Sequence, residues 1–184
     1  MKQLHCPSCG TPFVRVTAYE GTVERVLNRI KVLPFRCQLC TMRFHAFWTG
    51  SPNATQAFDR RQFRRLSTSL QATLLADNAI RSHNRVTDIS MAGCTLETES
   101  ALPKGTFLEI TIKPASDEEE IRVDTAMVCS VRAESMGVRF LEFHAAEKQR
   151  LSQVVLSLLV GQSVPARDEN ITFGSSGLND QIVD

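Results

Sequence analysis

The stretch LEITI at 108–112 alternates apolar and polar residues, and the same period of two returns in VDTAMVCSV at 123–131 and GVRFLEF at 137–143. Because successive side chains of a strand point to opposite faces of a sheet, each stretch predicts a half-buried β-strand. Turn residues lie between the stretches and no helical crossover separates them, which favours an antiparallel barrel or sandwich. The residues expected on one face of the second stretch are Val123, Thr125, Met127, Cys129 and Val131.

Towards the C-terminus the period of the apolar residues becomes that of a helix. The apolar positions are Leu151, Val154, Val155, Leu158 and Leu159. This i, i+3, i+4, i+7, i+8 spacing predicts an amphipathic helix whose apolar stripe covers an opening or an edge of the sheet. The residues that follow, 161–184, carry a net charge of −3 and little periodicity, so we expect a mostly disordered acidic tail.

Towards the N-terminus the chain changes in both charge and composition. Residues 1–49 carry seven basic and two acidic side chains, a net charge of +5, and four of the six cysteines. Short runs rich in β-branched and aromatic residues predict strands at 13–19, 29–35 and 43–48. The stretch GSPNATQAF is typical of a linker, which we place at 50–59.

The composition of the whole chain excludes several classes of protein. The 184 residues are 42% hydrophobic, which excludes wholesale disorder, and the net charge of +1 argues against a binder of nucleic acid across the whole surface. No apolar run approaches the ~20 residues of a membrane helix, and the first residues lack the apolar stretch of a signal peptide. We therefore expect a cytoplasmic protein with reduced thiols, in which clustered cysteines suggest a metal before they suggest disulfides.

Four cysteines are spaced as two CxxC pairs, with 27 residues between the pairs. Two thiolates separated by two residues can bind one ion from a single tight turn, and two such turns complete the tetrahedral site that zinc prefers. The predicted ligands of one structural zinc ion are Cys6, Cys9, Cys37 and Cys40. A module of under 50 residues has too small a core to fold unaided, so the metal would supply folding energy. The module resembles the zinc-ribbon family at these four positions.

Other interpretations of these residues are weaker. Iron is the next candidate metal, and a redox dithiol comes last because no βαβ pattern accompanies either CxxC pair. His5 and His45 flank the pairs, but with four thiolates available we expect neither to be a ligand. Cys94 and Cys129 lie in predicted strands and are interpreted as small buried hydrophobic residues.

Two further motifs lie after the linker. The first is a basic run with an RxxxR spacing at Arg61 and Arg65, and the second is DxSxxG at 88–93. Each alone is a weak signal, since arginine clusters are often solvated and Asp-x-Ser-x-x-Gly is an ordinary turn signature. Their pairing, 22 residues apart, is the informative observation.

At these motifs the sequence resembles the PilZ family, over about residues 60–160. The run MGVRF at 136–140 and the closing helix are also similar to that family. The resemblance implies a mainly β fold, a six-stranded antiparallel barrel with a C-terminal helix, here preceded by the zinc-ribbon-like module. It also implies binding of cyclic di-GMP, a bacterial second messenger, and no catalysis. The ligand-binding residues it implies are Arg61, Arg65, Asp88, Ser90 and Gly93, with Arg60 as a contact to a second, stacked dinucleotide.

The chemistry of these residue types agrees with such a ligand. An arginine fork can bind phosphate oxygens or the O6/N7 edge of guanine, and it stacks on bases. The carboxylate of Asp88 can accept hydrogen bonds from guanine N1–H and N2–H₂ together, Ser90 can add a donor or an acceptor, and Gly93 removes a Cβ from the path of the ligand. The basic run follows the linker directly, so we expect bound ligand to reorder it and to re-aim the zinc module, relaying the signal to a protein partner through that module or the tail.

Two other functions compete with this one. The basic N-terminal patch could make the chain a nucleic-acid-binding adaptor, although no helix with a base-reading face is predicted there and the module aromatics are expected in a core. These aromatics are Phe13, Phe35, Phe44, Phe47 and Trp48. A barrel that binds proteins without nucleotide ranks last, because the arginine and DxSxxG motifs are both present. An enzyme is not expected, because no catalytic pairing of side chains stands out.

Overall fold

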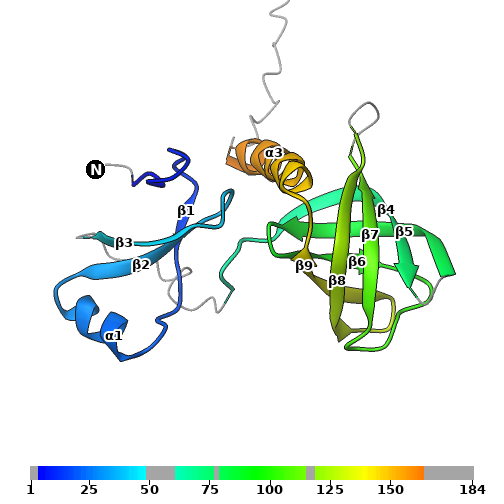
Figure 1. The fold of residues 1–184 in the computed structure, drawn as a ribbon, viewed down its shortest axis with the longest axis horizontal. Coiled ribbons are helices and arrows are strands. Elements are labelled where there is room, and N and C mark those ends of the chain that lie inside the picture. The colour runs from blue at the N-terminus through cyan, green and yellow to red at the C-terminus, as the bar shows by residue number, and fades with distance from the viewer. Residues whose placement is uncertain (1–3, 49–60, 77–78, 115–118, 164–184) are drawn as a thin grey trace, which may run out of the picture.

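The computed structural model describes residues 4–48, 61–76, 79–114 and 119–163, and the linker and the acidic tail predicted from sequence lie outside these ranges, apart from the first residues of that tail. Two β-structured regions lie side by side, with the C-terminal helix above the space between them (Figure 1). We call residues 4–48 the Cys module and residues 66–142 the barrel.

The barrel is closed and antiparallel, as the resemblance implied, with strand order β4-β5-β6-β9-β8-β7. Its strands are β4 (Leu66–Ala76), β5 (Ala79–Ser90), β6 (Gly93–Glu97), β7 (Phe107–Lys113), β8 (Ile121–Val131) and β9 (Ser135–Glu142). Closure comes from pairing of β4 with β7, in a register that places Ala72 opposite Ile112. The three strands predicted from alternation are therefore confirmed as β7, β8 and β9.

The face predicted for the strand at 123–131 is wrong in its second half. A register shift between Thr125 and Ala126 interrupts the pairing of β8 with β9. Because an extra residue in a bulge moves all later side chains to the opposite face, the buried residues change from odd to even positions. The buried residues of β8 are Ile121, Val123, Ala126 and Val128.

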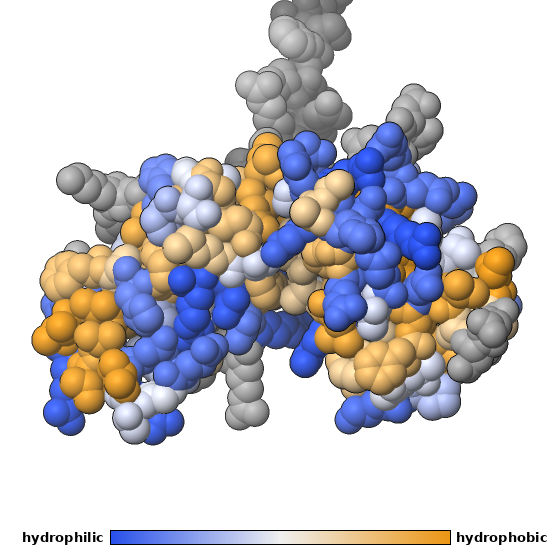
Figure 2. All heavy atoms as spheres, viewed as in Figure 1, coloured by the Kyte–Doolittle hydropathy of each residue, from blue (hydrophilic) through white to orange (hydrophobic). Residues whose placement is uncertain are grey.

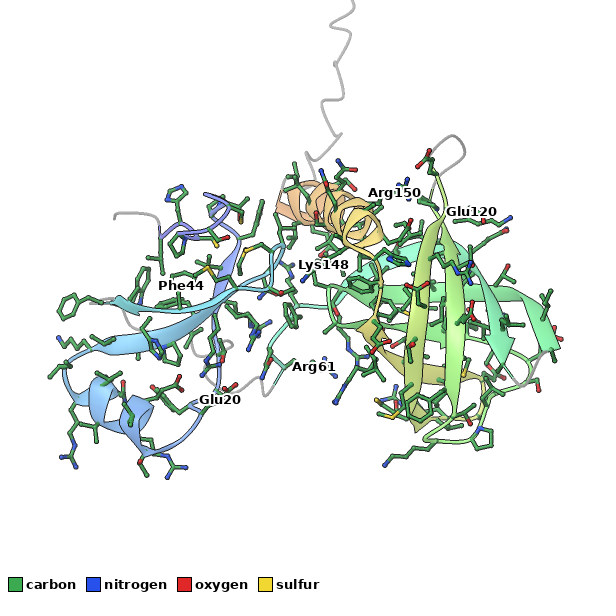
Figure 3. All side chains as sticks on the ribbon, viewed as in Figure 1. Glu20, Phe44, Arg61, Glu120, Lys148 and Arg150 are labelled. Atoms are coloured by element: carbon green, nitrogen blue, oxygen red, sulfur yellow. The ribbon has the colours of Figure 1, made fainter. Side chains whose placement is uncertain are left out.

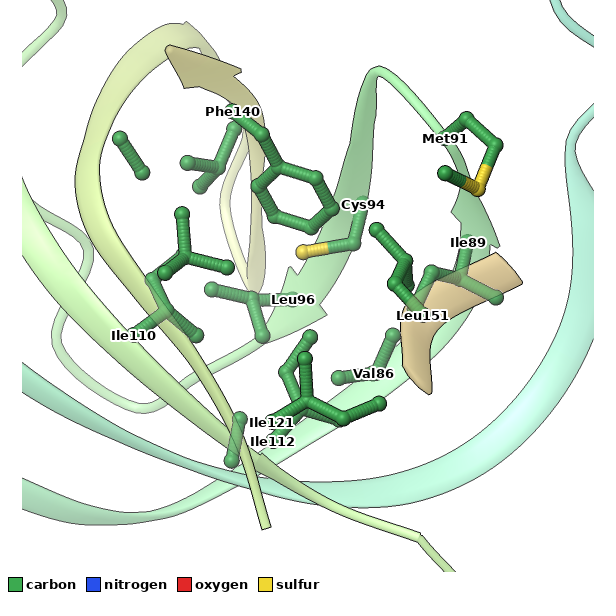
Figure 4. Close-up of a cluster of buried hydrophobic side chains, with 14 of the residues drawn as sticks. Val86, Ile89, Met91, Cys94, Leu96, Ile110, Ile112, Ile121, Phe140 and Leu151 are labelled. Atoms are coloured by element: carbon green, nitrogen blue, oxygen red, sulfur yellow. The ribbon is translucent and has the colours of Figure 1, made fainter. Parts of the chain in front are cut away.

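Aliphatic side chains fill the interior of the barrel (Figure 4). Leu66, Ile110 and Leu151 are each 0% exposed. Leu151 belongs to helix α3 (Ala145–Ser163), which contacts β4 and β8. Its turns bury Leu151, Val155 and Leu159. The predicted amphipathic helix is confirmed, and it extends to Ser163, three residues into the stretch that we expected to be disordered.

The Cys module is a three-stranded antiparallel sheet with one helix, with the order β1-β2-β3. Its elements are β1 (Val14–Val16), α1 (Thr22–Arg29), β2 (Val32–Cys37) and β3 (Arg43–Phe47). Phe35 stacks on Phe44 and meets the edge of Trp48, which gives the module a small aromatic centre. Phe47, expected in this core, is 64% exposed.

Helix α1 was not predicted, and the strand expected at 29–35 begins only at Val32. Three apolar residues follow a helical period: Val23, Val26 and Ile30. All three are exposed, so they do not form a buried face of the helix. The buried side chain of α1 is Glu24. Within the described residues, no helix is long and apolar enough to cross a membrane.

Candidate functional site

The RxxxR motif lies just before β4, in the segment that passes from the Cys module to the barrel (Figure 3). Arg65 precedes Leu66, the fully buried first residue of β4, so its backbone position is fixed by the barrel core. The Arg65 side chain reaches across β5 and β6. Its Nη1 lies 3.4 Å from Asp88 Oδ1 and donates a hydrogen bond of 2.9 Å to Thr95 Oγ1. The two motifs, far apart in sequence, therefore meet through Arg65 and Asp88.

The DxSxxG motif forms the tight turn between β5 and β6, in which Ser90 pairs with Gly93. Ser90 Oγ donates to the carbonyl of Gly93 at 3.1 Å and accepts from the N–H of Ala92 at 3.4 Å. A Cβ on Gly93 would lie 2.1 Å from the carbonyl oxygen of Val138 on β9. The path of a ligand was the reason expected from the sequence for glycine here, and it stays an expectation; the structure shows a different reason, the close approach of β6 and β9.

A cavity of about 590 Å³ brings residues of both motifs together. Its lining includes Arg61, Arg65, Ser90 and Gly93. Asp88 lies beside the cavity, paired with Arg65, rather than in the lining. Its Oδ1 is buried and accepts no hydrogen bond from the described residues, so it keeps acceptor capacity. The volume lies within the range of pockets that enclose small molecules.

Strands β8 and β9 supply a wall of the cavity that was not predicted from the sequence. This wall contains Cys129, Ser130, Gly137, Val138, Arg139 and Phe140. Cys129 is half-buried, not fully buried as expected, because the bulge in β8 turns it away from the core. Arg139 pairs with Gly93 across β6 and β9, so a third guanidinium group lies at the cavity. The run MGVRF contains this arginine, but only the pairing of strands reveals its neighbours.

Arg60, predicted to contact a second dinucleotide, lies outside the described residues. The cavity has guanidinium groups in its lining, and the carboxylate of Asp88 beside it can accept further hydrogen bonds. Arginine forks bind phosphate oxygens, whereas a carboxylate binds paired N–H donors such as those of guanine. The cavity can thus bind an anionic ligand that also carries N–H donors.

The four predicted metal ligands form a second candidate site, in the Cys module. The Sγ atoms of Cys6, Cys9, Cys37 and Cys40 all lie within 4.8 Å of one another. Two of the distances, between Cys6 and Cys40 and between Cys9 and Cys37, are 3.5 Å. Zinc bonded to sulfur at about 2.3 Å in a tetrahedron requires sulfur atoms roughly 3.8 Å apart, so the four residues fit the ion.

The backbone of both cysteine turns supports this geometry. Gly10 and Thr41 each follow the second cysteine of a pair, and both have positive φ, 72° and 65°. Positive φ is strained for a β-branched residue such as Thr41, and strain of this kind persists where the surrounding structure fixes it. The N–H of Leu39 donates to Cys37 Sγ at 3.4 Å, which orients that sulfur atom.

The thiols of the cluster differ in how readily they ionise. Burial opposes ionisation of Cys9, but hydrogen bonds from the side chain and backbone of Thr11 outweigh it and lower the pKa of Cys9 to about 6. Burial raises the pKa of Cys37 and raises that of Cys40 to about 12. Because burial disfavours the thiolate form at these two residues, a bound cation would be needed to stabilise four thiolates together.

Neither flanking histidine belongs to the cluster of potential metal ligands, as we expected. His45 Nε2 lies 2.9 Å from Glu24 Oε1. Arg43 Nη2 donates to both oxygens of the same carboxylate, at 2.8 and 2.7 Å. The hydrogen bonds from Arg43 outweigh the burial of Glu24 and lower its pKa to about 2. This polar centre joins α1 to β3 and was not found from the sequence, because its members are about 20 residues apart.

The chain is similar in sequence to one protein family and in structure to several solved proteins. The sequence model described as "PilZ domain" matches residues 59–157. No curated protein matches the chain. Among solved structures, Bacillus subtilis MotI/DgrA, an inhibitor of motility, is 16% identical with a TM-score of 0.50, covering 71% of this chain and 74% of its own.

Two further solved structures are similar. MrkH of K. pneumonia in its apo state is 18% identical with a TM-score of 0.50, covering 72% of each chain. The PilZ domain of Escherichia coli YcgR with c-di-GMP is 20% identical with a TM-score of 0.47, covering 56% of this chain and 95% of its own. At these identities MotI/DgrA and MrkH show a shared fold alone, and the family assignment comes from the sequence model, which covers more than half of the chain. The chain belongs to the PilZ domain family.

Proposed function

We propose that this protein is a receptor for cyclic di-GMP, which binds in the cavity between the RxxxR segment and the β5–β6 turn. The observation that carries the proposal is the meeting of Arg65 and Asp88 at 3.4 Å beside a cavity that Arg61, Ser90 and Gly93 also line. Cyclic di-GMP has two phosphodiester charges and two guanine bases. The arginines supply forks for the phosphates or guanine edges, and Asp88 supplies an acceptor for guanine N–H donors.

Membership of the PilZ family supports this ligand, because the motif residues of the resemblance are all present. Arg60 would contact a second, stacked dinucleotide. We assign no catalytic role to the cavity. In the Cys module, Cys6, Cys9, Cys37 and Cys40 would bind one zinc ion, which would stabilise the fold of a region with a small apolar core.

Calorimetric titration of cyclic di-GMP into the full chain tests the site. We expect Arg65→Ala and Asp88→Ala each to weaken binding at least tenfold, because each removes a charged hydrogen-bonding partner of the ligand. Arg122→Ala is the matched control, since Arg122 is 62% exposed and pairs with Glu109 near the other end of β8. Wild-type affinity in both site variants would refute the proposed site.

The signal would reach a protein partner through a rearrangement of the RxxxR segment and the Cys module. The exposed face of α1 supports a role of the module in partner binding. Val23, Val26 and Ile30 are 70%, 60% and 61% exposed, and Figure 2 shows apolar atoms gathered at this end of the module. Contiguous exposed apolar residues are typical of interaction surfaces. X-ray scattering profiles of the full chain with and without ligand should differ; identical profiles would contradict the rearrangement while leaving ligand binding intact.

Nucleic-acid binding is the second candidate function, and one observation favours it. The Cys module contains helix α1 after all, with Arg25 and Arg29 exposed on it. A phosphate-binding surface would lose DNA affinity steeply as salt rises. If the chain bound DNA only weakly and without such a salt dependence, the cyclic di-GMP receptor would remain the preferred function.

A further inference from the structure

Gln38 connects the two candidate sites. It lies between Cys37 and Cys40, and although polar it is only 6% exposed. Its side chain makes hydrogen bonds on both sides of Phe63: Nε2 donates to the carbonyl of Gln62 at 3.1 Å, and Oε1 accepts from the N–H of Arg64 at 2.7 Å. One amide group thus fixes the backbone of the RxxxR segment midway between its two arginines.

Other contacts also connect residues 36–41 of the Cys module with the RxxxR segment, the barrel core and α3. The guanidinium carbon of Arg36 lies 5.6 Å from the ring centre of Phe63, which lines the cavity. Leu39 is buried in the same hydrophobic cluster as the barrel core. On the other side, Lys148 Nζ of α3 lies 3.5 Å from Thr41 Oγ1, and Figure 3 shows Lys148 close to the Cys module. The turn that carries two metal ligands therefore packs directly on the segment that carries the ligand-binding arginines.

The position of Gln38 depends on the conformation of its turn. The turn contains Cys37 and Cys40, and the hydrogen bond from Leu39 N–H to Cys37 Sγ helps to fix it. The positive φ of Thr41 is strained, so the surrounding structure must hold the turn in this conformation. A metal ion bound to both cysteines would hold this conformation, and its loss would release it. Release of the turn would also free the backbone that Gln38 holds at Gln62 and Arg64.

We propose that Gln38 couples metal binding to nucleotide binding: with metal bound, the Gln38 amide holds the RxxxR segment over the cavity, so each ligand raises the affinity for the other. This inference rests on the proposed function of the cavity. Preorganisation lowers the entropy that binding must remove from the arginine segment. Because coupling between two binding sites is reciprocal, the same factor must appear from both sides, and we expect it to be about tenfold.

The test measures both affinities on the full chain. Cyclic di-GMP is titrated into zinc-loaded and zinc-depleted protein, and the zinc affinity is measured by competition with a chromogenic chelator, with and without cyclic di-GMP. We expect the wild type to bind the dinucleotide about tenfold more tightly with zinc, and to bind zinc tighter by the same factor with dinucleotide. Gln38→Ala should keep its zinc affinity in the absence of nucleotide, because Gln38 is not a metal ligand, but should lose the coupling.

Gln153→Ala, on the exposed side of α3, is the matched control and should behave as wild type. Equal dinucleotide affinities of zinc-loaded and zinc-depleted wild type would overturn the inference while leaving the receptor function intact. Undiminished coupling in Gln38→Ala would also overturn it, because zinc would then act on the cavity without the Gln38 amide. Absence of dinucleotide binding in every form would instead refute the proposed function itself.

Discussion

The barrel and the Cys module are both built from antiparallel strands, yet different interactions hold them together. The barrel closes on itself around aliphatic side chains that are fully buried, such as Leu66 and Ile110. The module has an open sheet, and its buried residues include thiols and the charged side chain of Glu24. Small domains bury too little apolar surface to fold on that basis alone. The difference indicates that the apolar core can stabilise the barrel, whereas the module would depend on a bound metal and on ion pairs.

Such a difference in stability would suit the contact between the two regions to the signalling that we propose. Elements of low intrinsic stability are those that rearrange when a ligand binds. The RxxxR segment contacts the barrel through Arg65, and it contacts the Cys module through Gln38. A ligand in the cavity would therefore act on the less stable of the two neighbours.

The largest predicted effect is the loss of the module when its metal is removed. The double substitution Cys9→Ser and Cys37→Ser should abolish hydrogen-exchange protection in β1, β2 and β3, because binding of structural zinc contributes about 10 kcal/mol in small zinc-binding modules. The amides of the barrel should stay protected. The measurement is amide exchange followed by mass spectrometry of peptides from each region.

Cys129→Ser is the control for this experiment, because it changes a cysteine of the barrel that is no part of the four-thiol cluster. It should leave protection of the module unchanged. If the double variant kept a protected module, the four thiols would not be what holds that region together, and the comparison between the two regions would fail.

The converse experiment truncates the barrel core. Ile110→Ala should lower the free energy of unfolding of the barrel by about 3 kcal/mol, because it leaves a cavity at a residue that is 0% exposed. Ile80→Ala removes the same atoms at a position that is 75% exposed, and should change stability by less than about 0.5 kcal/mol. Chemical denaturation monitored for each region measures both effects. Similar losses in the two variants would contradict the assignment of the core.

Gly93→Ala should have a smaller effect, at the strand contact beside the cavity. The new Cβ would collide with the carbonyl of Val138, and relief requires β6 to move away from β9, at a cost of about 1–3 kcal/mol. Gly161→Ala, in α3 where a Cβ meets open space, should be neutral or stabilising. Thermal unfolding of the two variants compares them directly. An unchanged midpoint temperature of unfolding in Gly93→Ala would show that β6 can move away from β9 without loss of stability.

The parts of this structure that follow a local period could be predicted from sequence, and the parts that depend on tertiary contacts could not. The strands β7 to β9, the stripe of α3 and the cysteine cluster all follow from spacing along the chain. The bulge at Thr125 leaves no mark in the alternation, so half of one strand face was predicted wrongly. Helix α1 is short, and its two valines, Val23 and Val26, are exposed. Gln38 and Arg139 gain their observed neighbours only when distant strands and turns meet.

The smallest predicted effect concerns the polar centre of the module. Glu24→Gln keeps the shape of the side chain but removes the charge that binds Arg43 and His45, and should lower the stability of the module by about 1 kcal/mol at neutral pH. Because folding lowers the pKa of Glu24, the carboxylate stabilises the module fully above its ordinary pKa of about 4.3 and loses this contribution as the pH falls towards about 2.

The difference in stability between wild type and Glu24→Gln, measured by thermal unfolding of zinc-loaded protein, should therefore be constant from about pH 8 to about pH 5 and shrink only in more acidic solution. Protonation of the cysteines would release zinc at low pH in both proteins, which is why the difference between them is the informative quantity. A difference that grew as the pH fell would mean that Glu24 is more easily protonated in the folded module than in the unfolded chain. The ion pair would then not be a stabilising element, and the module would rest on its metal site alone.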